Sequence, residues 1–163
     1  MLGAAWPVTI TKNIFFAVGN ICMFSYALLN YVDGGSIFFI LLQILIGVST
    51  VVMLLNRNDT TGAMVIAFCG GALVVYALYL FRDASTLLFV IGLCTLGVGY
   101  ALNMANIWRQ VVLTLGSLLI AWYSLIEGDQ IFLWLNVFFA LFSGYYAWKE
   151  NISLLLQALF KET

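Results

Sequence analysis

The chain has 163 residues, of which 64% are apolar and only 8% charged, and its mean hydropathy is +1.10. A soluble globular domain carries about 25% charged residues, so this chain has too few charges to cover a surface that faces water. Its formal net charge of −1 leaves no basic surface for a nucleic-acid backbone. Soluble enzymes, nucleic-acid-binding proteins and disordered regulators are therefore excluded, and the length predicts a single membrane domain over residues 1–163.

The charged residues divide the chain into six uncharged runs of 17 to 25 residues, which is the length of a membrane-spanning helix. The runs are 13–32, 34–56, 60–81, 84–108, 110–126 and 130–148. Short turn sequences between them, such as Asp33-Gly34-Gly35 and Glu127-Gly128-Asp129, predict that consecutive helices are antiparallel neighbours. The expected fold is all-α and integral to the membrane, with six transmembrane helices.

The two ends of the chain and its basic residues predict the orientation in the membrane. Residues 1–11 lack the basic start of a cleaved signal and are expected to lie at the interface, and residues 150–163 are expected to form a short surface tail. The basic residues on the side of the two termini are Lys12, Arg57, Arg109, Lys149 and Lys161. Only Arg82 lies on the opposite side, so both termini are predicted to be cytoplasmic, in the inner membrane of a cell.

Several landmarks recur along the chain at a spacing of 46 to 50 residues. They are Tyr26, Tyr76 and Tyr123; Asp33, Asp83 and Asp129; and Gly47, Gly97 and Gly144. The spacing predicts one helical hairpin repeated three times, over about 13–57, 60–109 and 110–149. Repeated transporter folds place substrate at the repeat interface. The alternative is a repeat that is kept only because its small residues pack well.

Ionisable residues are absent from all six runs, and the chain has no histidine. Proton relays, coupled pumps and catalytic carboxylates need such groups at depth, so we expect neither an enzyme nor an ion-driven antiporter. Cys22, Cys69 and Cys94 all lie in apolar runs without a CxxC motif, which argues against disulfides and a metal site. No catalytic residue, metal or cofactor is therefore predicted.

Two amides near the middle of predicted helices, Gln43 and Asn136, are the main candidates for binding a solute. An unpaired polar group in lipid costs several kcal/mol, so both should face the protein interior. There they would either join helices by hydrogen bonds, at about 1 kcal/mol each, or bind a solute. The last hairpin is rich in aromatic residues, and its stripe Trp134, Phe138 and Phe142 fits either packing and lipid contact or a flat solute. The predicted substrate-binding residues are Gln43, Asn136, Trp122, Trp134, Tyr76 and Tyr123.

Short motifs resemble three families of small membrane proteins, which fall into two groups. Gly144-Tyr145-Tyr146-Ala147-Trp148-Lys149 is similar to the last helix of PnuC-type vitamin-precursor transporters, and the stretch 81–109 is similar to the YgjV family of inner-membrane proteins. Leu42-Gln43-Ile44-Leu45-Ile46-Gly47 and Gly71-Ala72-Leu73-Val74-Val75-Tyr76 resemble the AmiS/UreI amide and urea channels. The resemblance to PnuC-type and YgjV proteins and the resemblance to AmiS/UreI channels both imply uncharged cargo that moves passively.

These observations lead to two functional hypotheses. The first is a passive transporter or channel for a small neutral polar solute, either a vitamin precursor or an amide-like compound. The alternative is an accessory or assembly subunit of a larger membrane complex that transports nothing, which also explains the lack of deep charges. The expected partners are the lipid bilayer, the solute, and either further copies of the chain or a larger complex, with no nucleic acid.

Overall fold

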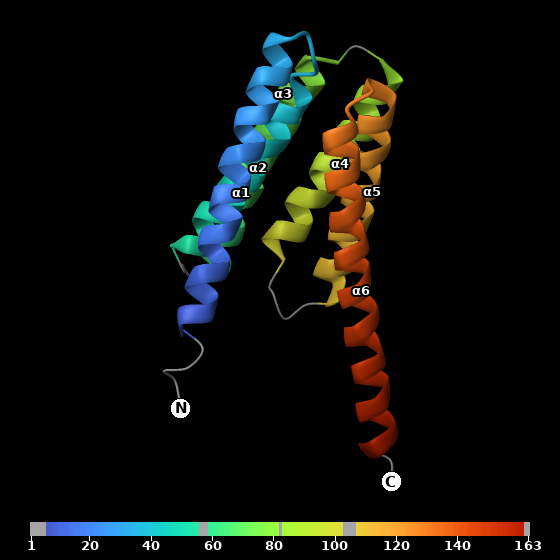
Figure 1. The fold of residues 1–163 in the computed structure, drawn as a ribbon. Helices are drawn as coiled ribbons and strands as arrows, with labels where there is room; N and C mark the ends of the chain where they lie inside the picture. The colour runs from blue at the N-terminus through green and yellow to red at the C-terminus, as the bar shows by residue number, and fades with distance from the viewer. Residues whose placement is uncertain (1–5, 56–58, 82, 103–106, 162–163) are drawn as a thin grey trace. The chain divides into compact units, whose positions relative to one another are not determined.

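The structure is a computed structural model that describes residues 6–55, 59–81, 83–102 and 107–161; for residues 6–13, 16, 59, 107 and 150–161 it describes the backbone alone. Among these residues the chain forms six α-helices (Figure 1). They are α1 (Trp6–Val32), α2 (Phe38–Leu54), α3 (Asp59–Tyr79), α4 (Ala84–Ala101), α5 (Ile107–Glu127) and α6 (Gln130–Lys161). The prediction of six helices is confirmed.

The helices group into two compact units, residues 1–80 and 81–163, and each is described by itself. In the first unit, α2 packs against both α1 and α3. In the second unit, α5 packs against both α4 and α6. Each unit therefore consists of three consecutive helices with the middle helix in contact with the other two. The three-hairpin repeat over 13–57, 60–109 and 110–149 stays a prediction.

The turns at the helix ends follow from glycine and aspartate residues at defined positions. Gly34 and Gly128 have φ of +95° and +76°, a left-handed conformation that costs glycine nothing. The backbone N–H of Phe132 donates to the Asp129 carboxylate at 3.0 Å, which satisfies a free donor in the first turn of α6. Asp83 does the same for the N–H of Thr86 in α4, at 3.1 Å.

The core of the second unit depends on close approach between α4 and α5. A methyl group added at Gly92 would lie 2.8 Å from the Ile120 side chain, and one added at Gly116 would lie 3.0 Å from the backbone nitrogen of Leu96. Glycine on both helices thus brings the two backbones together, as small residues do in membrane bundles. On the same two helices, Phe89 of α4 is fully buried and packs against Tyr123 of α5.

Four of the described helical segments are long and apolar enough to cross a membrane: Thr60–Tyr79, Ala84–Ala101, Trp108–Glu127 and Gln130–Lys149. The segments Ala17–Val32 and Phe38–Leu54 are also apolar but shorter. These helices are compatible with a membrane protein. The four long segments fit four of the predicted spans, and six crossings stay a prediction.

The ends of several helices differ from the predicted runs. α4 ends at Ala101, because Leu102 has an extended backbone with ψ of 144°, so the run 84–108 is not one helix. α6 continues without interruption to Lys161, so residues 150–161 of the predicted surface tail prolong this helix (Figure 1), and residues 162–163 lie outside the described residues. Lys149 and Glu150 are good helix formers, and a charge marks where water begins rather than where a helix stops. Of the start predicted to lie at the interface, residues 6–11 belong to α1, and residues 1–5 lie outside the described residues.

Candidate functional site

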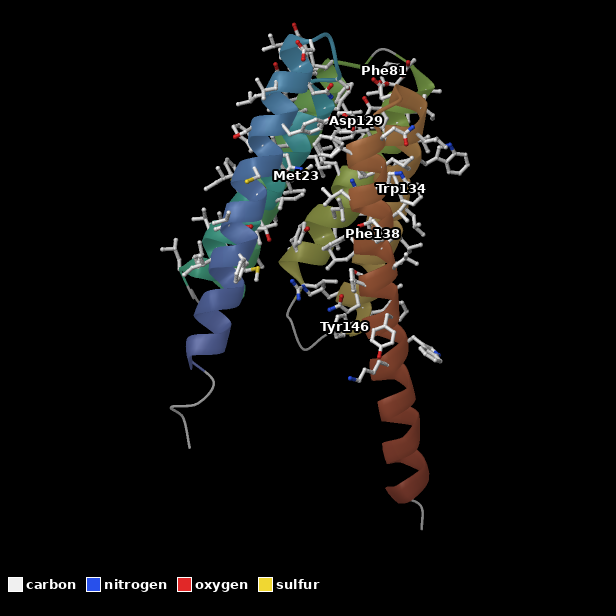
Figure 2. All side chains as sticks on the ribbon, viewed as in Figure 1. Met23, Phe81, Asp129, Trp134, Phe138 and Tyr146 are labelled. Atoms are coloured by element: carbon white, nitrogen blue, oxygen red, sulfur yellow. The ribbon has the colours of Figure 1, made fainter. Side chains whose placement is uncertain are left out.

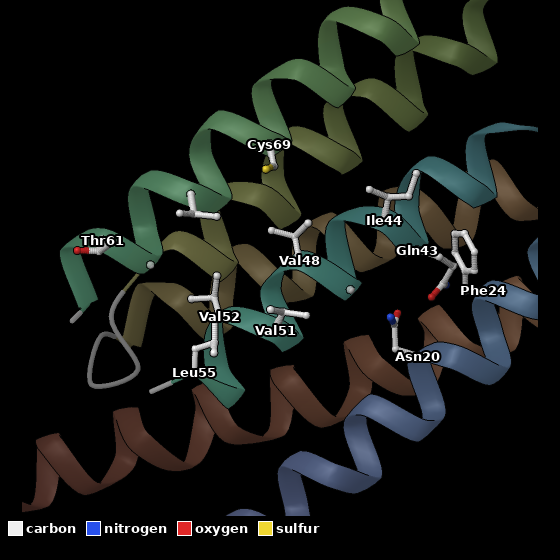
Figure 3. A pocket seen from close by; sticks show the side chains of 13 residues that line it. Asn20, Phe24, Gln43, Ile44, Val48, Val51, Val52, Leu55, Thr61 and Cys69 are labelled. Atoms are coloured by element: carbon white, nitrogen blue, oxygen red, sulfur yellow. The ribbon is translucent and has the colours of Figure 1, made fainter. Parts of the chain in front are cut away.

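The first unit contains a partly open cavity of about 640 Å³ between α1, α2 and α3 (Figure 3). Most of the side chains in its walls are apolar, and they include Ile44, Val48 and Val52. The side chains with polar atoms are Asn20 from α1, Gln43 from α2, and Thr61 and Cys69 from α3. Asp, Glu, Lys and Arg are absent from the described residues of this lining. This part of the cavity wall is thus apolar and uncharged, with few polar groups, which is the usual composition of a small-molecule site.

Gln43 is the most deeply buried polar residue of this cavity, with 1% of its surface exposed. Neither its amide oxygen Oε1 nor its amide nitrogen Nε2 has a hydrogen-bond partner. The Gln43 side chain points toward Asn20 (Figure 3). A buried amide without partners has lost its bonds to water and gained none in return, which costs about 1–3 kcal/mol for each unsatisfied group. The prediction that Gln43 faces the protein interior is confirmed.

Asn20 is the second amide of the cavity, and the sequence analysis did not select it. Its oxygen Oδ1 is buried without a hydrogen-bond partner, and its nitrogen Nδ2 lies 2.9 Å from where a side chain on Gly47 would begin. The signal in the sequence is the turn at residues 33 and 34: Asn20 lies 13 residues before Asp33, and Gly47 lies 13 residues after Gly34. Equal distances from the turn of an antiparallel hairpin place two residues opposite each other.

Several other polar side chains in the described helices are satisfied within their own helix. The hydroxyl groups of Thr50, Ser117 and Ser124 each donate to the carbonyl four residues earlier, at 2.8 Å. Asn136 is buried, and its Nδ2 donates to the Phe132 carbonyl at 2.8 Å. This local bond satisfies a polar group without a second helix.

Unpaired buried polar atoms are therefore concentrated in one place. Among the described residues, the buried side-chain nitrogen and oxygen atoms without a partner are Asn20 Oδ1, Gln43 Nε2, Gln43 Oε1 and Arg109 Nε. Three of these four atoms belong to residues that line the cavity of the first unit. Because buried polar groups are nearly always hydrogen-bonded, these three atoms need an explanation.

The other predicted site residues do not line this cavity. Tyr76 is exposed on α3, and Trp122 and Trp134 are 61% and 56% exposed on α5 and α6. Tyr123 is 1% exposed and packs against Phe89, with the ring centres 5.2 Å apart, so it belongs to the core of the second unit. Of the six predicted residues, the cavity includes Gln43 alone.

The aromatic stripe of α6 lies on the outside of the second unit. Trp134, Phe138 and Phe142 are all more than half exposed, and the Trp134 and Phe138 ring centres are 6.2 Å apart (Figure 2). This arrangement favours the interpretation of the stripe as packing or lipid contact over that of a solute site. No group of three or more metal-binding side chains occurs among the described residues.

Comparison of the chain with protein-family models, with curated proteins and with solved structures gives no match in any of the three. The resemblance to PnuC-type, YgjV and AmiS/UreI proteins therefore stays an expectation. The function is argued from the cavity and the helices that form it.

Proposed function

We propose that the chain is a passive transporter or channel that carries a small neutral polar solute across a cell membrane. The observation that supports it is the cavity of the first unit, in which Gln43 Nε2, Gln43 Oε1 and Asn20 Oδ1 have no partner within the protein. A solute that bonds to these atoms recovers hydrogen bonds that the protein lost when it buried them. Both amides are neutral, so a neutral solute binds here without the desolvation cost of an ion.

The passive character of the proposed transport follows from the lining of the cavity. Coupling to protons or ions uses ionisable side chains that change charge or bind the ion within the membrane. Among the residues that the structure describes, those that line this cavity include no Asp, Glu, Lys or Arg. The solute then moves down its own concentration gradient, and its binding neither takes up nor releases a proton.

The proposal includes six crossings, the three-hairpin repeat and two cytoplasmic termini. The shortest helix, α2, has 17 residues and is therefore about 25 Å long, the lower end of what spans a bilayer core of about 30 Å. The five-to-one distribution of basic residues supports the orientation.

Uptake by vesicles tests the proposed transport. The purified full chain is reconstituted into proteoliposomes, and the entry of radiolabelled neutral solutes such as benzamide and glycerol is followed with and without an imposed pH gradient. We expect entry of at least one solute that exceeds that of protein-free vesicles, stops at equal concentrations on both sides and is unchanged by the gradient. Accumulation driven by the pH gradient, or no entry above the protein-free control for any solute, would contradict the proposal.

A second candidate function is the accessory subunit of a larger membrane complex. It is favoured by the exposed apolar side chains around the cavity, which include Val51, Leu55 and Val65. A helix of a partner protein that covered them could also bond to Gln43. Purification in mild detergent separates the two candidates: a chain that is isolated alone or with copies of itself favours transport, and constant co-purification with other chains favours the accessory role.

A further inference from the structure

We propose that Asn20 and Gln43 form one binding site that recognises a neutral group with two hydrogen-bond donors beside one acceptor, and that Gly47 positions Asn20 for this task. The inference rests on the proposed function only for the claim that the bound solute is also the transported one. Its basis is the pattern of unpaired atoms in the cavity between α1, α2 and α3.

The unpaired atoms define what a ligand must offer. Gln43 Oε1 and Asn20 Oδ1 each accept a hydrogen bond, and Gln43 Nε2 donates one. A ligand that satisfies all three atoms therefore donates twice and accepts once. A planar group with an NH2 next to a carbonyl does this. Its NH2 and its carbonyl oxygen form two parallel hydrogen bonds with the oxygen and the nitrogen of the Gln43 amide. Rotation of the Gln43 or the Asn20 amide by half a turn exchanges its donor and its acceptor. A ligand with an NH2 next to a carbonyl still offers both kinds of hydrogen-bond partner.

The remaining walls decide what else the ligand carries. Phe24, Ile44 and Val48 line the cavity beside the two amides (Figure 3). These side chains favour an apolar or aromatic body attached to the hydrogen-bonding group. A carboxylate or an ammonium group would lose its hydration here without a charged partner, because the described part of the lining contains no charged residue. The ligand is therefore uncharged.

Gly47 is the residue that leaves space for the Asn20 amide. A methyl group at this position would lie 2.9 Å from Asn20 Nδ2, closer than carbon and nitrogen atoms approach without a bond between them. The Asn20 amide would have to turn aside, because the obstacle meets its end rather than its backbone. Gly47 itself lines the cavity, and it acts through Asn20 as a positioning residue.

Equilibrium binding of a methylated amide series tests the recognition. The full chain in lipid nanodiscs is titrated with benzamide, N-methylbenzamide, N,N-dimethylbenzamide and benzoate. In N-methylbenzamide the methyl group replaces the N–H on the same side as the carbonyl oxygen, which is the N–H that pairs with the Gln43 amide. We therefore expect this compound to bind about tenfold more weakly than benzamide. The dimethyl compound and benzoate should bind more weakly still. Equal affinities for benzamide and N-methylbenzamide would overturn the proposal without the need for any variant.

Variants assign the discrimination to the named residues. Gln43→Leu should bind the first two amides equally, and Asn20→Ala should weaken benzamide binding about three- to tenfold. Thr50→Val is the matched control, because Thr50 is a buried polar residue of the same helix that bonds to Ile46 and does not line the cavity. Unchanged discrimination in Gln43→Leu would also overturn the proposal.

A double-mutant cycle tests the role of Gly47. Gly47→Ala should weaken benzamide binding in the wild-type background and have no effect in the Asn20→Ala background, because its effect passes through the Asn20 amide. If Gly47 had a purely structural role, Gly47→Ala would cause the same loss of benzamide affinity in both backgrounds, and this result would overturn the positioning role of Gly47.

Binding is measured without transport, so selective binding without vesicle entry contradicts the proposed function alone. Vesicle entry without selective binding contradicts this inference alone.

Discussion

At the scale of single residues, the buried amides differ in how their lost bonds to water are replaced. Asn136 and Gln43 both carry a side-chain amide, and both are buried within apolar runs. Asn136 Nδ2 donates to the Phe132 carbonyl of its own helix, whereas Gln43 has no partner for either amide atom. Gln43 thus lowers the stability of the empty protein and provides bonds for a ligand, while the amide nitrogen of Asn136 already has its bond.

The first prediction concerns the stability of a Gln43→Leu variant. Replacement of an unpaired buried amide by an apolar side chain of similar size should raise the free energy of unfolding by about 1–3 kcal/mol. Equilibrium unfolding of the ligand-free chain in detergent measures it, with Thr50→Val as the control. A decrease of about 1 kcal/mol or more in Gln43→Leu would instead indicate that Gln43 joins the helices by hydrogen bonds.

The second prediction concerns the pH dependence of the α4 cap. The Ser85 hydroxyl donates to the Asp83 carboxylate at 2.6 Å, and this bond, together with the N–H of Thr86, lowers the pKa of Asp83 from its ordinary value of 3.8. A lowered pKa in the folded state means that the stabilisation is complete above the ordinary pKa and disappears as the pH falls through the lowered one. The difference in unfolding free energy between the wild type and Asp83→Asn should therefore shrink as the pH is lowered from 6 toward 3. A constant difference over this range would contradict the cap.

At the scale of helices, the contact between α4 and α5 is set by glycine. A third prediction follows for Gly116→Ala: the added methyl lies 3.0 Å from the backbone nitrogen of Leu96, which cannot turn aside. We expect a loss of about 1–3 kcal/mol of stability, as for overpacked cores. Gly71→Ala in α3 is the matched control, because nothing lies within 4 Å of its added methyl. Equal effects of the two substitutions would show that close packing does not decide the result.

The positions of the helices could be predicted largely from the charges, because a charge in an apolar run is costly in lipid and so marks the ends of spans. The ends of α4 and α6 could not, since a helix may continue past Lys149 into water or stop at Ala101 inside an uncharged run. Gln43 was predictable as an amide that must face inward. The Asn136 amide has a hydrogen-bond partner and the Gln43 amide has none. This difference depends on side-chain orientation and packing, which the pattern of residue types does not contain.

At the scale of the whole molecule, the proposed function includes a chain that crosses the membrane and has both termini in the cytoplasm. Four segments are long and apolar enough, and Ala17–Val32 and Phe38–Leu54 are the shorter ones. The fourth prediction is that reporter tags at either end are protected from protease added to intact spheroplasts, while a tag inserted at Arg82 is cleaved. Cleavage of a terminal tag and protection of the tag at Arg82 would reverse the proposed orientation.

The most direct measurement of the central claim is the rate of benzamide entry into proteoliposomes that contain the wild type, Gln43→Leu or Thr50→Val at equal protein density. We expect Gln43→Leu to reduce the protein-dependent rate at least tenfold, because the solute loses its two parallel hydrogen bonds to the Gln43 amide. Thr50→Val should leave the rate within about twofold of the wild type. Entry through Gln43→Leu at the wild-type rate would contradict the claim that this cavity carries the solute.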